Sequence, residues 1–211
     1  MVTLHVIVEG GTYDVAVASN VEALREAFNR FFSRFLGRED LSVEVEMGAG
    51  YKNAVKTYLK DTGQYLWVDS DDQDTAKWYE RLENDEKPIM IALDDRKHIY
   101  FMIQEMEAWF LKQPDCFDRW AEAEGYIRVK GDTLIKDDNT IAGKNIEALQ
   151  KPSDIVDTII QRYFERIDAK GRQRKVKYGK LKSAPGLIDN LDARSLEEVD
   201  AQLARFHNEI P

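Results

Sequence analysis

The sequence predicts an α/β protein with a mainly parallel sheet flanked by helices, followed by a helical carboxy-terminal portion. In the first half of the chain, short apolar runs alternate with amphipathic segments of helical length. This alternation is typical of βαβ units joined by right-handed crossovers. From Gln104 onward the strand signals fade while the helical periodicity continues. We therefore expect an α/β core over residues 1–113 and a helical and loop portion, packed on that core, over residues 114–211.

Strands and helices are expected to alternate through the core. The opening strand, "VIVEGG", is an apolar run that stops at Glu9 and a Gly-Gly pair, as buried parallel strands often do. The next segment places apolar residues at helical spacing between a cap at Asn20 and a stop at Gly37. The elements expected after that helix are a strand over 41–47, a helix over 54–61, a strand over 64–72, a helix over 73–84, and strands over 89–93 and, as a candidate fifth, 98–102.

Helical signals dominate the carboxy-terminal portion. The last helix is expected to begin at Ser195, because Ser195 and Glu198 stand in capping-box spacing. The expected elements are, in order, a helix over 105–123 broken near Pro114, a loop region over 125–151 rich in Gly, Asp, Lys and Asn, and helices over 153–167, capped by Ser153, and over 195–210.

The composition limits the class of protein. The chain has 211 residues, 43% of them hydrophobic, which is enough for one substantial core. No apolar stretch approaches the ~18 residues that a membrane helix needs, and the amino terminus lacks the features of a signal peptide. We expect a cytoplasmic protein without membrane contacts. Its single cysteine, Cys116, excludes an internal disulfide framework and is expected to be a small buried hydrophobe.

Acidic residues follow two of the expected strands. Glu9 ends the first strand, and Asp69 and Asp71 end the strand "LWVDSDD". In a parallel sheet both groups lie at the same edge, and in an extended segment Asp69 and Asp71 point to the same side. Carboxylates this close favour a hard divalent cation such as Mg²⁺. The alternative interpretation is helix capping, which accounts for the acids after the second of these strands but not for Glu9.

Basic residues gather in one segment of an otherwise acidic chain. The net charge of −9 argues against nucleic acid as a partner, yet "KGRQRKVKYGKLK", residues 170–182, carries seven Lys or Arg residues and no acid. Such a block can follow a phosphate backbone; the alternative is a solvated basic loop. The candidate nucleic-acid contacts are Arg172, Arg174, Lys175, Lys177 and Lys180, with Tyr178 available to stack on a base, and Lys52 beside the Gly-rich turn "GAGYKN".

Several motifs resemble known families. "VEGGTYD" and "LWVDSDD" resemble the Glu and D-x-D motifs of the Toprim fold, which topoisomerases, primases and overcoming-lysogenization-defect nucleases share. "FMIQEMEAWFLKQPD" and "KYGKLKSAPGLIDNLD" are similar to segments of the bacterial domain of unknown function 4276 family, so the resemblance covers nearly the whole chain. It implies a Toprim-like sheet in the core.

The resemblance also implies roles for individual residues. Glu9 would be a metal ligand or general acid/base, and Asp69 and Asp71 would hold the divalent metal. Glu107, the Glu of "MEAWFL", would be an additional acid, although periodicity alone treats it as an exposed residue of a core-packing helix. Tyr13 departs from the pattern because Toprim-like nucleases often have Glu there. A second metal would then need Asp14 or Glu107 in its place.

The leading hypothesis is a Mg²⁺- or Mn²⁺-dependent nuclease that acts on DNA or RNA, in a bacterial defence setting, with an ATPase as the implied partner. In the second hypothesis a degenerate Toprim-like site belongs to a non-catalytic subunit that binds nucleic acid or a nucleotide and contacts the ATPase. The third hypothesis is a phosphotransferase or phosphohydrolase that acts on small molecules. The long basic segment argues against it, because a small phosphate ester does not need so long a positive tract. The sequence leaves the oligomeric state open.

Overall fold

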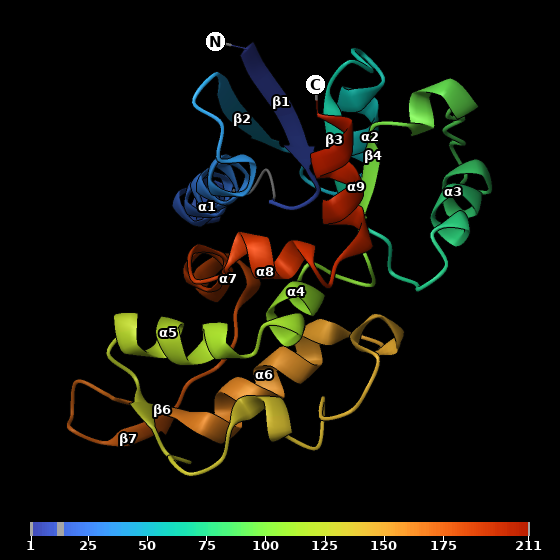
Figure 1. The fold of residues 1–211 in the computed structure, drawn as a ribbon. Coiled ribbons are helices and arrows are strands. Elements are labelled where there is room, and N and C mark those ends of the chain that lie inside the picture. The colour runs from blue at the N-terminus through green and yellow to red at the C-terminus, as the bar shows by residue number, and fades with distance from the viewer. Residues whose placement is uncertain (1, 12–14, 211) are drawn as a thin grey trace.

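The computed structural model describes residues 2–11 and 15–210 and confirms the α/β fold (Figure 1). Its main sheet consists of four parallel strands in the order β2-β1-β3-β4. The central strands β1 and β3 are apolar and largely buried, which suits strands covered on both faces. The strands are β1 (Val2–Val8), β2 (Leu41–Met47), β3 (Tyr65–Asp69) and β4 (Ile99–Met102).

Helices cover both faces of this sheet. On one face, α1 (Ala18–Leu36) buries a row of phenylalanines at helical spacing against Val6 and Val8 of β1. On the other face, α2 (Tyr51–Tyr58) and α3 (Ala76–Glu83) pack against strand side chains that point away from α1, such as Ile7 of β1. The alternation of β1 side chains between the two faces therefore builds two separate apolar clusters.

The carboxy-terminal portion is mainly helical, as expected, and its last helices return to the sheet. In Figure 1, α7 and α8 lie beside α1, and α9 runs back along β3 and β4. Phe206 of α9 packs against Trp67 and Tyr100, with ring centroids 5.5 and 5.0 Å apart. The helices are α4 (Glu107–Lys112), α5 (Asp115–Ala123), α6 (Pro152–Tyr163), α7 (Lys180–Asp189), α8 (Ala193–Glu197) and α9 (Ala201–Glu209).

A small antiparallel sheet, which the sequence patterns did not predict, lies at the far end of the molecule. It consists of β5 (Ile127–Arg128), β6 (Phe164–Ile167) and β7 (Gln173–Lys175), in the order β5-β6-β7. The basic segment forms the β6–β7 turn, β7 and the chain up to α7. Short 3₁₀ turns complete the structure at Val15–Val17, Leu93–Arg96, Ile135–Asp137 and Ile146–Ala148.

Three sequence-based expectations are wrong in detail. Residues 89–93 form no strand: Met90 and Leu93 are 68% and 79% exposed, and the chain enters a 3₁₀ turn at Leu93. The helix expected over 153–167 ends at Tyr163, because the residues after it pair with β7. The helix expected over 195–210 is two helices, whose amino ends are capped by the carboxylates of Asp192 and Asp200.

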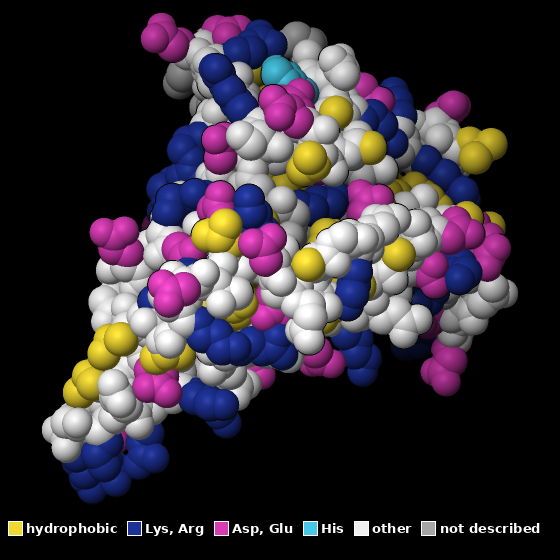
Figure 2. Space-filling view, turned by 60° about the horizontal axis from the view of Figure 1, so that its bottom comes forward, with side chains coloured by type: hydrophobic (Ala, Val, Ile, Leu, Met, Phe, Trp, Pro, Cys, Tyr) yellow, Lys and Arg dark blue, Asp and Glu magenta, His cyan; other side chains and the backbone are white. Residues whose placement is uncertain are grey.

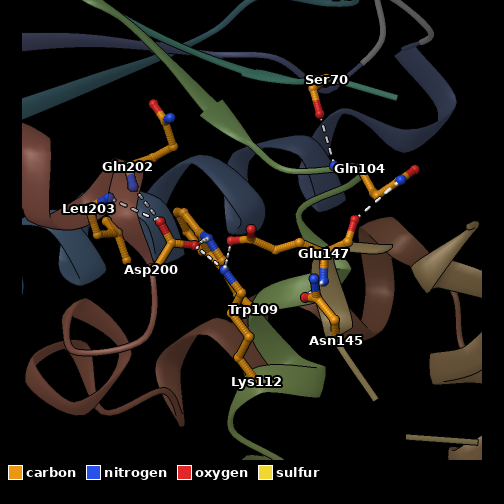
Figure 3. A network of polar contacts seen from close by, with 9 residues as sticks. All are labelled: Ser70, Gln104, Trp109, Lys112, Asn145, Glu147, Asp200, Gln202 and Leu203. Carbon is orange, nitrogen blue, oxygen red and sulfur yellow. Dashed lines mark hydrogen bonds and ion pairs between the residues drawn. The ribbon is translucent and has the colours of Figure 1, made fainter. Parts of the chain in front are cut away.

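A buried ion-pair network ties α4 to the carboxy-terminal helices (Figure 3). Lys112 Nζ lies 2.8 Å from Asp200 Oδ2 and 2.8 Å from Glu147 Oε1. Trp109 Nε1 donates to the same Asp200 oxygen at 3.0 Å. Only 6% of the Lys112 side chain and 1% of the Asp200 side chain are exposed. The network therefore fixes α4, and with it the residues that begin α4, relative to α9.

Within residues 2–11 and 15–210, none of the helices combines the length and the apolar character that a membrane span requires.

Candidate functional site

The acids that follow β1 and β3 meet at the carboxyl edge of the sheet. Glu9 N–H donates to the Trp67 carbonyl at 2.7 Å, which continues the pairing of the two strands by one residue. Its side chain turns back, and Glu9 Oε2 accepts the Asp69 N–H at 3.1 Å. Parallel pairing thus brings together two acids that are sixty residues apart in the sequence.

Glu107 reaches the same place from the beginning of α4. Asp69 Oδ1 accepts the Met106 N–H at 2.8 Å, which docks the start of α4 on the end of β3. The Glu107 side chain is fully buried. Its Oε1 accepts a hydrogen bond from the Tyr178 hydroxyl at 2.7 Å, whereas its Oε2 has no hydrogen-bond partner among the described residues. A buried carboxylate oxygen without a donor is costly and points to an ionic role.

Lys180 supplies a cation to these acids. Its Nζ lies 3.0 Å from Asp69 Oδ2 and 3.4 Å from Glu107 Oε2, and 40% of its side chain is exposed. We call Glu9, Asp69, Glu107 and Lys180 the acidic site. The sequence patterns predict nucleic-acid contacts at Lys180 and Tyr178, and in the structure the polar ends of both side chains contact the acids.

Burial perturbs the ionisation of every member of the acidic site. Burial and the charges of Asp69 and Asp71 raise the pKa of Glu9 from 4.5 to about 8. Burial likewise raises the pKa of Asp69 and of Glu107, against the attraction of Lys180. Burial opposes the charged form of Lys180, yet the two carboxylates beside its ammonium outweigh this and raise the pKa of Lys180. Such concentrations of perturbed groups are typical of functional sites.

Asp71 lies beside the acidic site and, in addition to burial, its charge helps to raise the pKa of Glu9 and of Asp69. Its backbone has φ 55°, in the left-handed region, and its N–H donates to the Gln104 carbonyl at 2.8 Å. The segment is therefore not extended at Asp71, which removes the geometry behind the expectation that Asp69 and Asp71 point to the same side. The Asp71 carboxylate forms an ion pair with Arg81, which stacks on Tyr51.

A neighbouring acid, Glu105, which precedes α4, has a different role. Its Oε2 accepts the Ser153 N–H at 2.8 Å at the start of α6. It thus serves as a cap for the positive end of that helix. Glu107, and not Glu105, is therefore the residue of this segment in the acidic site.

The Gly-rich turn before Lys52 lies against the carboxyl end of β1. Gly48 N–H donates to the Val8 carbonyl at 2.8 Å, and Ala49 N–H donates to the Gly10 carbonyl at 2.7 Å. The turn therefore adjoins the residues on either side of Glu9.

A Cβ at Gly48 would lie 2.3 Å from Ala54 Cβ, so this glycine allows β2 to approach α2 closely. The Lys52 ammonium forms an ion pair with Asp85, which follows α3.

The basic segment lines a groove that shares Tyr178 with the surroundings of the acidic site. The groove has a volume of about 750 Å³, and we call it the basic groove. Its lining includes Arg166, Arg174, Lys175, Lys177, Lys182, Tyr126, Tyr178 and Gly179. Figure 2 shows Lys and Arg side chains gathered at the projecting lower-left end of the molecule, where β6 and β7 lie in Figure 1.

The basic residues of the groove and of the turn beside it differ in whether their charges are already paired with acids. Arg172, at the β6–β7 turn, and Arg174 both pair with Asp168. Lys175 and Lys177 are exposed and have no ion-pair partner in the described part of the chain. Tyr178 joins the two regions, because it lines the groove while its hydroxyl donates to Glu107.

The donor set fits a divalent metal in its chemistry but not in its present arrangement. Carboxylate oxygens are the ligands that Mg²⁺ and Mn²⁺ prefer. Among the described residues, none donates a hydrogen bond to Glu107 Oε2. The ammonium of Lys180 shows that the carboxylates of Asp69 and Glu107 bind a cation between them. Among residues 2–11 and 15–210, however, no three Asp, Glu, His or Cys side chains already form a metal-binding group. Tyr13 and Asp14, which bear on a second metal, lie outside the described residues.

The pKa of Glu9 predicts a pH-dependent stability. An acid with a higher pKa in the folded state holds its proton preferentially there, so stability falls as pH rises from about 4.5 to about 8. We expect the wild type, in chelator, to lose on the order of 2 kcal/mol of unfolding free energy relative to Glu9→Gln between about pH 5 and about pH 9. Urea unfolding of both proteins across this range measures the difference. Parallel pH curves would contradict the burial of an ionisable Glu9.

A family model described as "Domain of unknown function (DUF4276)" matches residues 8–210. No curated protein and no solved structure matches the chain.

Proposed function

This chain belongs to the DUF4276 family, and we propose that it is a Mg²⁺- or Mn²⁺-dependent nuclease with a Toprim-like core, acting on the phosphodiesters of DNA or RNA. The observation that supports this proposal most is that one residue, Tyr178, belongs to the basic groove and also contacts the acidic site. Tyr178 lines the groove and binds Glu107. A strand held in the groove would bring its phosphates toward the buried acids.

In this proposal Asp69 and Glu107 would hold the metal, with Glu9 beside them. The bound ion would supply Lewis-acid stabilisation of the charge that develops on the phosphate. Lys175 and Lys177 bind the backbone, and Tyr178 orients Glu107. Glu9, whose pKa is raised to about 8, can hold a proton at its carboxyl near neutral pH and deliver it to a leaving oxygen. Asp71 is committed to Arg81 and would act through its charge rather than as a ligand.

One observation favours a second function. Lys180 already neutralises Asp69 and Glu107, as it would in a non-catalytic subunit that binds nucleic acid or a nucleotide without a metal. An ATPase partner, a role in bacterial defence and a cytoplasmic location rest on sequence reasoning alone and remain predictions.

Cleavage of end-labelled oligonucleotides separates the two functions. Single- and double-stranded DNA and RNA are incubated with the protein in Mg²⁺, in Mn²⁺ and in chelator. The nuclease proposal expects metal-dependent cleavage of at least one of these substrates. Binding of nucleic acid without cleavage in either metal would favour the non-catalytic subunit.

The basic groove predicts a salt-dependent affinity. Each lysine that contacts a phosphate contributes about one unit to the slope of log affinity against log salt. We expect Lys175→Met and Lys177→Met each to reduce this slope by roughly 0.7–0.9 for single- or double-stranded DNA. Fluorescence anisotropy over a salt series measures it. Lys56→Met, an exposed lysine of α2, is the control and leaves the slope unchanged. Equal slopes in all variants would remove the basic groove from the proposal.

A further inference from the structure

Lys180 holds a position that a metal ion would compete for. Its ammonium contacts Asp69 Oδ2 at 3.0 Å and lies 3.4 Å from Glu107 Oε2. In the described part of the chain it is the one cation that forms ion pairs with these two carboxylates. A divalent ion bound to the same oxygens would stand within a few ångströms of the ammonium, and like charges at that distance repel strongly in a partly buried site.

The acids cannot dispense with a counter-charge. Asp69 and Glu107 are both buried, and none of the described residues donates a hydrogen bond to Glu107 Oε2. Two uncompensated carboxylates in such a place are unfavourable. The ammonium of Lys180 and a metal ion are therefore alternative counter-charges for the carboxylates of Asp69 and Glu107.

The chain before Lys180 connects this competition to the basic groove. Lys177, Tyr178 and Gly179 line the groove, and Lys180 follows them as the first residue of α7. Its side chain is 40% exposed, and its four-carbon stem is flexible. A phosphate near Gly179 would therefore offer the ammonium a second anionic partner within the reach of its side chain.

We propose that Lys180 is an exchangeable counter-cation that couples metal binding to nucleic-acid binding. Without nucleic acid its ammonium holds Asp69 and Glu107 together and weakens metal binding. A phosphate in the basic groove draws the ammonium away and leaves the two carboxylates to the metal. This regulation rests on the proposed metal-dependent function, since it assigns Lys180 a role toward the metal of that site.

Calorimetric Mn²⁺ titration of the full chain tests the coupling. Without nucleic acid, Lys180→Met is expected to bind Mn²⁺ at least about tenfold more tightly than the wild type, within the usual range of couplings between sites. The control Lys56→Met removes an exposed lysine of α2 that belongs to neither the acidic site nor the basic groove, and its Mn²⁺ affinity stays within about twofold of the wild type.

A second titration adds a saturating phosphorothioate oligonucleotide, with the Mn²⁺ binding of the oligonucleotide alone subtracted. The wild type is expected to gain about tenfold in Mn²⁺ affinity, whereas Lys180→Met gains little because its carboxylates are already released. Circular dichroism checks that each variant folds, and Lys180→Gln repeats the test should Lys180→Met be destabilised.

The outcomes separate this inference from the proposed function. If both Lys180 variants bind Mn²⁺ no more tightly than the wild type, the exchange is overturned while the metal site stands. If neither the wild type nor any Lys180 variant binds Mn²⁺, with or without the oligonucleotide, the metal site and the exchange both fall. Tighter binding by the Lys180 variants together with an unresponsive wild type would retain the competition and overturn the coupling to nucleic acid.

Discussion

Asp69→Asn is expected to lower metal-dependent cleavage at least about a thousandfold, equivalent to about 4 kcal/mol of transition-state stabilisation. Asp69 contacts Glu9, the residue before α4, and Lys180: its N–H donates to Glu9 Oε2, its Oδ1 accepts the Met106 N–H, and its Oδ2 pairs with Lys180. Asparagine keeps an oxygen for the Met106 N–H and removes the charge that a metal requires. Initial rates of oligonucleotide cleavage in Mg²⁺ measure the loss.

The matched control for this substitution is Asp72→Asn in the same "DSDD" motif. The Asp72 carboxylate pairs with Lys77 and accepts the Asp74 N–H, so it belongs to the start of α3 rather than to the acidic site. Its cleavage rate should stay within about twofold of the wild type, as is usual for a surface substitution. An Asp69→Asn protein that folds and retains a tenth or more of the wild-type rate would contradict the assignment.

Lys112→Met is expected to reduce the unfolding free energy by about 3 kcal/mol, because breaking a buried ion pair leaves an uncompensated charge. Lys112 and Asp200 are 6% and 1% exposed, and together with Trp109 they join α4 to α9 (Figure 3). Chemical denaturation followed by circular dichroism measures the change. Since this network also positions α4, any cleavage activity should fall with it.

Two further variants give this stability prediction its controls. Lys144→Met alters a lysine whose Nζ donates to the Thr140 carbonyl, and we expect a change within about 0.5 kcal/mol. Lys112→Met/Asp200→Asn removes both of the buried charges of this ion pair, and asparagine can still cap α9, so part of the lost stability should return. A double variant less stable than Lys112→Met alone would mean that the charge of Asp200 is not the source of the loss.

Local sequence patterns predict the two acids of the site that lie at the ends of β-strands, Glu9 and Asp69. Val6 to Val8 form a buried strand because they are apolar and end at Gly10, and the same holds for the strand that ends at Asp69. Parallel pairing then brings Glu9 and Asp69 to one edge without further information. This much follows from periodicity and from the topology of βαβ units.

The remainder depends on contacts between distant segments. Residues 89–93 have a strand composition, yet no neighbour pairs with them, and the chain turns at Leu93. Nothing local in "KYGK" distinguishes a lysine that meets phosphate from one that meets buried carboxylates. Lys180 contacts Asp69 across 111 residues, and only the packing of α7 against α1 brings it there. The resemblance drew attention to this segment but gave Lys180 no role among the acids.

Mn²⁺ binding in the presence of a phosphorothioate oligonucleotide tests the central claim most directly. Calorimetry compares the wild type with Asp69→Asn and Glu9→Gln, with folding checked by circular dichroism. The acidic site predicts that the wild type binds Mn²⁺ beyond what the oligonucleotide alone takes up, and that Asp69→Asn abolishes this binding while Glu9→Gln abolishes or weakens it. Wild-type protein that shows no such binding at millimolar Mn²⁺, or folded variants that bind as the wild type does, would contradict it.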